Sequence, residues 1–389
     1  IYAGCYLKNM EKFIEPATVA LADECHLLIN SEEIVFSRNS QDILNIFTIL
    51  IWAKLALKDL NWNPSVTHLE TIEKLAPILR NLRHSDAGLP RFHGSYGDVD
   101  GQLDQALSNA ESREISSIET SIGFAKLSNS RTTVIIDAAP PPMGEKAVKA
   151  DASTLAFEMV SGQRRVFTSC GPGYLFGSDL SYVSRKTSSH CAVYVDDHNS
   201  SQFSETKDWL QTPKKVIING PKTVPKEISN NAGIGIFEGA HDGYVKSHGL
   251  THVRKLKLSQ DGQTLEGEDL MIAIEDSHKK QFDKISKKNN SDKLSVKAAF
   301  HLHPNVLPRL DQENNLLSLA LKNGEVWIFN YGLDLHLELK PTIFFENGLF
   351  EPVKSKKLIL SADLLEYGTR IKWSLSRAND KDLLVGDLF

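Results

Sequence analysis

The segment Val253-Arg-Lys-Leu-Lys-Leu258 alternates apolar and basic side chains with a period of two. Because successive side chains of a strand point to opposite faces, this pattern predicts a half-buried β-strand. The dipeptide Asp261-Gly262 follows it, and similar dipeptides occur at Asn323-Gly324 and Asn347-Gly348. Such pairs favour the tight turns of β-hairpins. The segment therefore predicts an antiparallel sheet built from hairpins.

The same character extends along the chain from Gly123 onward. Many strands at short spacing without intervening helices favour a sandwich over a parallel α/β sheet. We therefore predict one large antiparallel β-sandwich domain over residues 118–389. The other runs that predict strands are Arg131–Asp137, Thr154–Met159, Cys191–Asp196, Lys215–Ile218, Glu325–Phe329, Leu335–Leu339, Lys357–Leu360 and Thr369–Leu375.

Residues 1 to about 85 have the periodicity of helices instead. Apolar residues recur near every 3.6 positions between Leu44 and Leu55, and again in Val66–Leu82. Ser65 is a suitable N-cap for the second helix. Antiparallel helices joined by short loops predict a layered α/α arrangement, so the fold class is α+β with two domains.

Two polar stretches separate or interrupt these domains. Residues 84–117 are rich in Gly, Asp, Ser and His and predict an interdomain loop with one short helix near Leu103–Ala110, within a helical domain of residues 1–117. Long loops in compact proteins often carry function. Lys279–Asp292 is charged and predicts a solvated loop. The basic pairs Arg164-Arg165 and Lys255–Lys257 indicate solvated sheet edges.

The charge of the chain limits its partners. The 389 residues carry a formal net charge of −5, and the isoelectric point is near 6.3. A nucleic-acid-binding protein usually has a basic excess, so this class is not favoured. An acidic surface also repels a polyanionic sugar chain at long range. Attraction of an acidic substrate would therefore require a local basic groove.

The sequence does not indicate one cellular compartment. The four cysteines are too few and scattered for a disulfide framework, and buried thiols are expected. The most apolar stretch, Ile43 to Leu57, is shorter than a membrane span needs. Position 1 is Ile, and no signal-peptide pattern follows it. A cytoplasmic location is therefore not excluded.

Several motifs in order along the chain resemble the bacterial heparinase II/III-like family, particularly its uncharacterised members. The similar stretches run from Glu32 to the end and cover nearly all of the chain. The resemblance implies an N-terminal α/α toroid, here with helices missing, followed by a β-sandwich in the periplasm or cell envelope. The strongest motifs are Ala152–Gly162, Thr187–Asp197, Gly239–Tyr244 with His252 and Arg254, and Phe300–Pro304.

The family resembles other uronate lyases, which cleave acidic polysaccharides by β-elimination beside a hexuronic acid carboxylate. A base must remove the weakly acidic C5 proton, and an acid must protonate the leaving glycosidic oxygen. Cations or hydrogen-bond donors must also stabilise the charge that develops on the carboxylate. The resemblance thus implies an acidic polysaccharide or oligosaccharide as the partner.

The resemblance also assigns roles to residues. Arg38 and Asn39 lie where the family has an Arg-containing motif opening a helix, and they would hold the substrate carboxylate. Tyr96 lies on a Gly-rich loop and would exchange protons with one of His190 or His241. Three further residues in or beside the strand motifs would contact substrate, and these are Arg185, His252 and Arg254.

No cofactor is expected. In metal-binding relatives the residue matching His190 is a ligand, but the partner positions read Lys149-Ala-Asp151 and Thr168-Ser-Cys170, without a His. Zinc sites use three or four N, S or O ligands, so one imidazole is too few. Asp151, Cys170 and His190 stay as an unusual alternative set for a structural zinc ion.

Structural interpretations remain open beside these roles. His190 precedes a strand of buried character and could be a core histidine with a backbone partner. The segment His241–Tyr244 has the composition of a turn. Tyr96 could pack at an interface. His301 and His303 alternate on one strand and share a face, for which a structural role is favoured.

Two functions therefore stand at this stage. The first is a polysaccharide lyase acting on a uronate-containing glycan. The alternative is a catalytically impaired relative that binds glycan or organises the envelope, which the missing histidines favour. The sequence does not specify the glycan, the cleavage mode or the oligomeric state.

Overall fold

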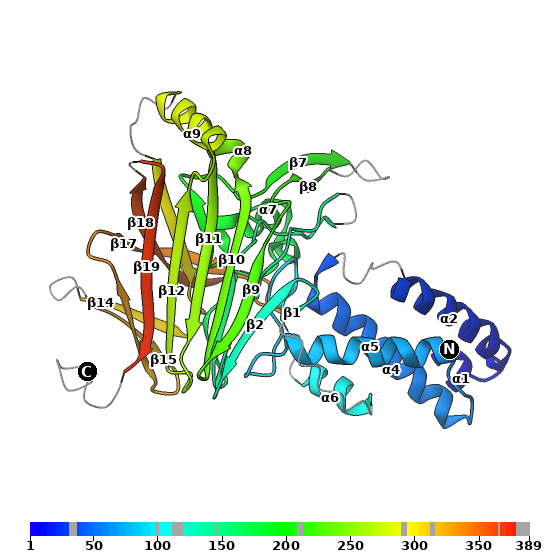
Figure 1. The fold of residues 1–389 in the computed structure, drawn as a ribbon. Helices are drawn as coiled ribbons and strands as arrows, with labels where there is room; N and C mark the ends of the chain where they lie inside the picture. The colour runs from blue at the N-terminus through cyan, green and yellow to red at the C-terminus, as the bar shows by residue number, and fades with distance from the viewer. Residues whose placement is uncertain are drawn as a thin grey trace.

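The computed structural model places a helical part at one side of a large β domain (Figure 1). It therefore has the predicted class, α+β with a helical part followed by an antiparallel sandwich. The structure describes residues 1–30, 37–97, 101–110, 120–144, 147–207, 213–288, 294–311, 316–364 and 366–378.

The helical part is built from amphipathic helices with polar caps. Asn39 Oδ1 accepts hydrogen bonds from two backbone amides at the start of α4, and Ser65 Oγ accepts one from His68 N at 3.2 Å at the start of α5. Both caps satisfy amides that have no partner in the first turn. The helices are α1 (Tyr2–Tyr6), α2 (Ile14–Asn30), α4 (Ser40–Asp59), α5 (Val66–Leu82) and α6 (Gln102–Asn109), with a short 3-10 turn η1 (Glu11–Phe13).

The strands of the β domain form antiparallel ladders throughout. Five strands make a sheet in chain order, which are β1 (Thr120–Ser121), β2 (Phe124–Asn129), β3 (Thr132–Asp137), β4 (Phe157–Ser161) and β5 (Arg164–Phe167). A four-stranded sheet has the order β17 (His336–Phe344), β18 (Val353–Leu364), β13 (Leu294–His301) and β6 (Val193–Val195). A bridge between Phe167 and Leu302 connects these two sheets.

An eight-stranded sheet forms the other layer. Its order is β14 (Val306–Asp311), β15 (Leu316–Leu321), β16 (Val326–Tyr331), β19 (Gly368–Arg377), β12 (Thr264–Ile272), β11 (Leu250–Leu258), β10 (Ile234–Tyr244) and β9 (Lys226–Asn231). The hairpin between β11 and β12 turns at the predicted Asp261-Gly262, where Gly262 has φ 67°. A separate hairpin joins β7 (Gln202–Lys207) and β8 (Pro213–Asn219).

Aromatic side chains from all three large sheets meet in the sandwich core. Trp373 of β19 stacks on Phe157 of β4, with ring centroids 5.6 Å apart, and packs edge-on against Phe300 of β13 at 4.9 Å. Such ring pairs add stabilisation beyond their buried area. This cluster fixes the two layers of the sandwich against each other.

The helices pack on the β domain through a second core. Phe47 of α4 and Leu79 of α5 are fully buried in one cluster with Phe124 of β2 and Ile135 of β3. Figure 1 shows α4 and α5 beside β1 and β2. The junction between the two parts is therefore a packed interface.

Helix α4 is long and apolar enough, by length and composition, to cross a bilayer. In the fold, 61% of its most apolar window is buried. A core helix passes the same composition test, so this feature is weak evidence for a membrane span.

Two predictions about polar stretches were wrong. Of the loop predicted over Lys279–Asp292, residues 279–288 instead belong to α9 (Asp276–Lys288), whose Phe282 is only 5% exposed, and residues 289–292 lie outside the described residues. The high content of Lys masked the apolar pair Phe282 and Ile285, which lies on one helix face. Arg165 does not lie on a solvated edge, since it is paired with Asp86 and Glu158.

Candidate functional site

Arg38 lies at the junction, immediately before α4. Its five N–H groups all donate within the fold. Nε donates to Ile122 O at 3.1 Å, and Nη1 donates to the carbonyls of Ala139 and Pro140. Nη2 donates to Gly123 O at 2.8 Å and to the carboxylate of Asp137. Arg38 therefore holds the start of the β domain and has no spare donor for a substrate carboxylate.

The side chain of Asn39 is also partly engaged in hydrogen bonds within the fold. Its Oδ1 accepts from Gln41 N at 2.9 Å and from Asp42 N at 3.2 Å as the cap of α4. Its Nδ2 is buried and makes no hydrogen bond among the described residues. An unpaired buried donor is uncommon and costs stability. The amide is thus the one group of this pair that a further acceptor could satisfy.

A chain of buried polar groups connects Arg38 to His190. Asp137 on β3 binds Arg38, and its Oδ2 lies 3.3 Å from His93 Nε2. His93 N donates to Asp151 Oδ2 at 2.5 Å, while His93 Nδ1 accepts from Asp151 N at 3.1 Å. Asp151 Oδ2 lies 4.0 Å from His190 Nε2. The structure thus brings the predicted residues Arg38 and His190 into one cluster.

Burial changes the protonation of this cluster. Desolvation and the nearby His93 lower the pKa of His190 to about 3. Desolvation raises the pKa of Asp151 to about 7, although the Arg185 guanidinium acts in the opposite direction. The imidazole is therefore neutral at pH 7, and neither of its nitrogens has a hydrogen-bond partner among the described residues. His190 is, however, only 1% exposed.

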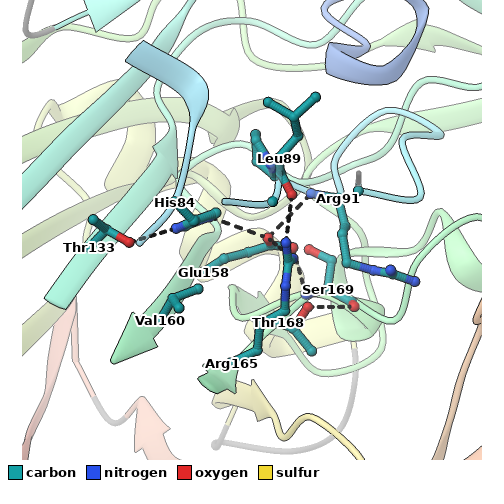
Figure 2. Close-up of polar contacts among 12 residues, drawn as sticks. His84, Leu89, Arg91, Thr133, Glu158, Val160, Arg165, Thr168 and Ser169 are labelled. Carbon is teal, nitrogen blue, oxygen red and sulfur yellow. Dashed lines mark hydrogen bonds and ion pairs between the residues drawn. The ribbon is translucent and has the colours of Figure 1, made fainter. Parts of the chain in front are cut away.

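A second buried network ties the loop after α5 to the sandwich. Figure 2 shows Glu158 of β4 at its centre. The Glu158 carboxylate accepts from Arg91 N at 3.2 Å and from Ser169 N at 2.9 Å, and it lies 3.8 Å from His84 Nε2 and 3.5 Å from Arg165 Nη1. Burial alone would raise the pKa of Glu158, but His84 and Arg165 outweigh it and lower the pKa. The predicted interdomain loop is thus buried where it meets β4.

Tyr96 lies apart from His190 along this loop. It lines a cavity of about 180 Å³ together with Arg91, Arg165 and His303. Its carbonyl accepts from Arg91 Nη1 at 2.5 Å. Among the described residues no hydrogen bond, ion pair or ring contact joins Tyr96 to His190 or His241, so their joint catalytic role stays a prediction.

His241 belongs to a third network, inside the eight-stranded sheet. Its Nδ1 accepts from Gly243 N at 3.1 Å, so its proton sits on Nε2, which faces His252 Nδ1 at 3.2 Å. His252 Nε2 donates to Asp269 Oδ1 at 2.9 Å, and Arg254 Nε donates to the same atom at 2.7 Å. All four ring nitrogens have partners, and each of the three predicted residues is at most 2% exposed.

Arg254 also crosses the sandwich. Its Nη1 donates to Leu155 O at 2.6 Å and to Cys191 O at 2.7 Å. Arg254 therefore fixes the strand after His190 against the eight-stranded sheet. These contacts give His241, His252 and Arg254 a structural role, and their contact with substrate stays a prediction.

An open groove lies beside the first cluster, at the hairpin β7–β8. It has a volume of about 610 Å³ and runs along the 3-10 turn η3 (Gly173–Phe176) and helix α7 (Ser178–Ser184). Two tyrosines, four cations and two acids line it, which are Tyr174, Tyr182, Lys149, Arg185, Lys214, Lys215, Asp179 and Glu205. The lining is therefore basic although the chain is acidic.

Cations lie against the tyrosine rings of this groove. Lys215 Nζ is 3.7 Å from the Tyr182 ring centroid, and Lys149 Nζ is 5.0 Å from that of Tyr174. These are cation–π distances. Tyr174 Oη donates to Gly94 O at 3.3 Å, which ties the groove to the interdomain loop.

Arg185 connects the groove to the buried cluster. Its Nε donates to Ala150 O at 2.6 Å and its Nη1 to Lys215 O at 2.6 Å. Its Nη2 is buried and has no hydrogen-bond partner among the described residues. Arg185, predicted to bind substrate, is thus the predicted residue that lies at an open groove and keeps a free donor.

Among the residues of the alternative metal set, the Cys170 thiol has other partners. Burial raises the pKa of Cys170 to about 12, and its Sγ lies 3.5 Å from the carbonyl oxygens of Gly171 and Ser184. Zinc binds the thiolate, so an ion here would have to displace the thiol proton, and the set stays an alternative. Lys149, in the segment that the sequence comparison matched to a ligand His, places its ammonium 3.5 Å from Asp42. Cys170 and the three other cysteines are free.

Sequence reasoning missed most of the groove. Tyr174 and Tyr182 belong to a segment after Cys170 that has no strand periodicity, and Lys215 belongs to a run predicted only as a strand. The adjacent pair Lys214-Lys215 was the one available signal for a local basic surface.

Comparisons with known proteins agree with this architecture. FtsZ-localized protein C of Caulobacter vibrioides (strain NA1000 / CB15N) is 25% identical over an alignment 389 residues long, which covers 97% of this chain and 64% of that protein. A heparan sulfate lyase from Pedobacter heparinus has a similar structure, with a TM-score of 0.66 and 12% identity over 97% of this chain and 58% of the lyase. A heparinase III matches with a TM-score of 0.68 and 13% identity, over 92% of this chain and 54% of that chain.

The chain spans less than two-thirds of the length of each of these proteins. At such identities the solved structures establish the fold. The model of the C-terminal domain of heparinase II/III-like proteins matches residues 119–374, more than half of the chain. The chain therefore belongs to the heparinase II/III-like family, and residues 119–374 form its C-terminal domain.

Proposed function

We propose that this protein is lyase-like in lineage and binds an acidic, uronate-containing glycan in the groove beside β7–β8. The observation that carries the proposal is the basic, tyrosine-lined groove on a chain of net charge −5. Four cations against two acids give the groove a local positive charge. Such a local field attracts an anionic chain that the whole molecule would repel.

The groove offers the contacts that an acidic sugar chain requires. The half-buried rings of Tyr174 and Tyr182 can pack against the apolar parts of sugar rings, while Lys149 and Lys215 can pair with carboxylates or sulfates. The free Nη2 of Arg185 is a buried cationic donor, which forms stronger hydrogen bonds than a neutral one.

The test is a binding measurement with heparin and with non-sulfated uronate polymers as probes. We expect the double variant Lys149→Ala/Lys215→Ala to weaken binding at least about tenfold, since two charge-assisted contacts of about 1.5–3 kcal/mol each would be lost. Affinity should also fall with added salt. The matched control is Lys255→Ala, whose ammonium lies on the sheet surface 2.7 Å from Glu238, and it should bind like wild type. Equal binding by the double variant, or no binding of any probe by wild type, would refute the proposal.

A specific observation favours a second function, β-elimination on the same glycan. His190 is neutral, neither of its ring nitrogens has a hydrogen-bond partner among the described residues, and its Nε2 lies 4.0 Å from Asp151 Oδ2, so the pair places an imidazole nitrogen beside a carboxyl group. Tyr174, at the edge of the groove, supplies a phenol that could act as the acid. The assay is the absorbance of the unsaturated uronate product.

The same geometry favours binding without turnover over elimination. Arg38 and His241 are fully engaged inside the fold, and Asp151 and His190 are at most 4% exposed. Product release that is lost in Tyr174→Phe and in His190→Gln would establish the lyase. Binding without product from any probe would leave the glycan-binding function.

The Caulobacter relative supports a proposal for location. That protein is described as localised with FtsZ. We infer that this protein also associates with the cell envelope where FtsZ assembles. A fluorescent fusion should then concentrate at the division site, and a uniform distribution would contradict the inference.

A further inference from the structure

Two histidines and an aspartate gather where β6 ends. Asp196 and His198 directly follow β6 of the four-stranded sheet, and His248 is the last residue of α8 (Val245–His248), between β10 and β11 of the eight-stranded sheet. One ligand atom from each of the three lies within 4.8 Å of the other two. The rings of His198 and His248 meet edge to face, with centroids 4.7 Å apart.

The fold holds two of these side chains in place. Asp196 has φ 49°, an uncommon conformation outside glycine that often marks functional positions. Its backbone N–H donates to Ser295 O at 2.7 Å, and its Oδ1 accepts from Ser295 N at 2.9 Å. His248 is 2% exposed, and its Nδ1 lies 2.8 Å from Ser247 Oγ.

These supporting contacts leave ligand atoms available. The Ser247 hydroxyl engages one nitrogen of His248 and so fixes the ring, which leaves Nε2 for another partner. Metal-bound histidines usually have such a hydrogen bond at the second nitrogen. Asp196 keeps Oδ2, and the exposed ring of His198 can rotate toward both.

We propose that Asp196, His198 and His248 bind one divalent transition-metal ion, with zinc as the best chemical match. Zinc takes imidazole and carboxylate ligands at about 2.0–2.2 Å in a tetrahedron, so the ligand atoms need only close by an ångström or two. Three protein ligands leave a fourth position. The fourth coordination position would face solvent along a cavity of about 430 Å³, which His198 lines.

The surrounding charges permit a cation here. Asp197 is exposed next to the site, and Lys297 Nζ lies 3.9 Å from its Oδ1, so the charge of Lys297 is directed at Asp197. Lys246 also lines the cavity. A bound ion would join the segment after β6 to α8 and so link the two layers of the sandwich. It would also set the position of the cavity wall between residues 197 and 204.

The experiment titrates Zn²⁺ into metal-stripped full-length protein in competition with a chromophoric chelator. We expect one ion per chain and a higher melting temperature with zinc. His198→Ala should weaken binding by about a hundredfold or more, since removing even a supporting contact costs 10–100-fold. It should also abolish the zinc-induced shift in melting temperature. Because His198 is exposed, this variant should fold normally without metal.

The matched control is His336→Ala, an exposed histidine on β17 outside the cluster, which should bind zinc like wild type. Asp196→Asn keeps the hydrogen bond from Ser295 N and tests the carboxylate separately. The absence of stoichiometric zinc binding by wild type, or equal binding by His198→Ala, would overturn the proposal. The glycan-binding proposal is tested with different variants, so neither result decides it.

Discussion

Each of the five N–H groups of Arg38 has a partner inside the fold. At the scale of single residues these partners are an argument against the carboxylate-binding role that the motif match predicts for Arg38. A guanidinium has the same geometry whether it binds a substrate carboxylate or Asp137. Only the positions of the carbonyls around it, which come from the turn between β1 and β2 and from the segment after β3, decide between the two roles.

Arg38→Lys tests the structural role. Lysine keeps the charge beside Asp137 but has three donors, so at least two of the buried carbonyls lose their partner. We expect the free energy of unfolding to fall by about 2–4 kcal/mol, since an unpaired buried polar group costs about 1–3 kcal/mol. Denaturant unfolding measures it, and the affinity of the folded protein for heparin should be unchanged.

The control for this substitution is Arg309→Lys on the exposed surface of β14. Its free energy of unfolding should change by no more than about 0.5 kcal/mol. A loss of glycan affinity in Arg38→Lys without a loss of stability would instead support the role predicted from the sequence.

At the scale of elements, periodicity located the strands but not the polar helix. The runs Val253–Leu258 and Thr369–Leu375 lie in β11 and β19, because one face of each strand is buried and the pattern is local. In α9 only Phe282 and Ile285 contact the core, so a window dominated by Lys has no strong period. Tertiary packing, not composition, makes this segment helical.

The site was harder to predict than the strands. Its groove combines Lys149, Tyr182 and Lys215, which belong to three separate segments and meet only because the β7–β8 hairpin folds beside α7. His190 was found from its motif, but its complete burial follows from Phe92 and neighbouring segments packed over it. Neither contact can be predicted from the spacing of residues along the sequence.

Phe282→Ala tests whether one anchor holds α9. Phe282 contacts Tyr367 with ring centroids 5.7 Å apart. Removing a buried Phe side chain costs about 3 kcal/mol or more. Because α9 lies at one end of the sandwich (Figure 1), we expect local opening. Hydrogen exchange should show faster exchange in α9 while β11 and β12 stay protected.

The control is Lys280→Ala on the exposed face of the same helix, which should leave exchange unchanged. Equal acceleration across α9 and the strands would mean that the helix is part of the global folding unit. Rapid exchange of α9 in the wild-type protein would favour the loop predicted from the sequence.

At the scale of the whole molecule, buried titratable groups should make the fold acid-sensitive. His190 and His301 have pKa values lowered by burial from 6.5 to about 3. Between these pH values the unfolded chain binds protons that the folded chain excludes, so stability is lost as pH falls below about 6.5. The lowered pKa of Glu158 changes the stability in the same direction. Its charged form stabilises the fold, and this contribution is lost as pH falls through the folded pKa.

Asp151 changes the pH dependence of stability in the opposite direction. Its folded pKa of about 7 is above its ordinary value of 3.8, so the folded state gains a proton first and is favoured as pH falls from 7 toward 4. We expect the melting temperature to fall from pH 7 to pH 4, and to fall more steeply in Asp151→Asn, which lacks this compensation. Calorimetry across this range measures both. A flat profile in wild type, or an identical slope in the variant, would contradict these assignments.

The strand order of the large sheet has a consequence for the time course of folding. β19 lies between β16 and β12, so β14–β16 and β9–β12 become one sheet only when residues 368–377 insert between them. Pairings so distant in sequence form slowly. During synthesis both half-sheets must wait, with an exposed edge each, until this strand leaves the ribosome. Chaperone dependence and aggregation should therefore concentrate in that interval.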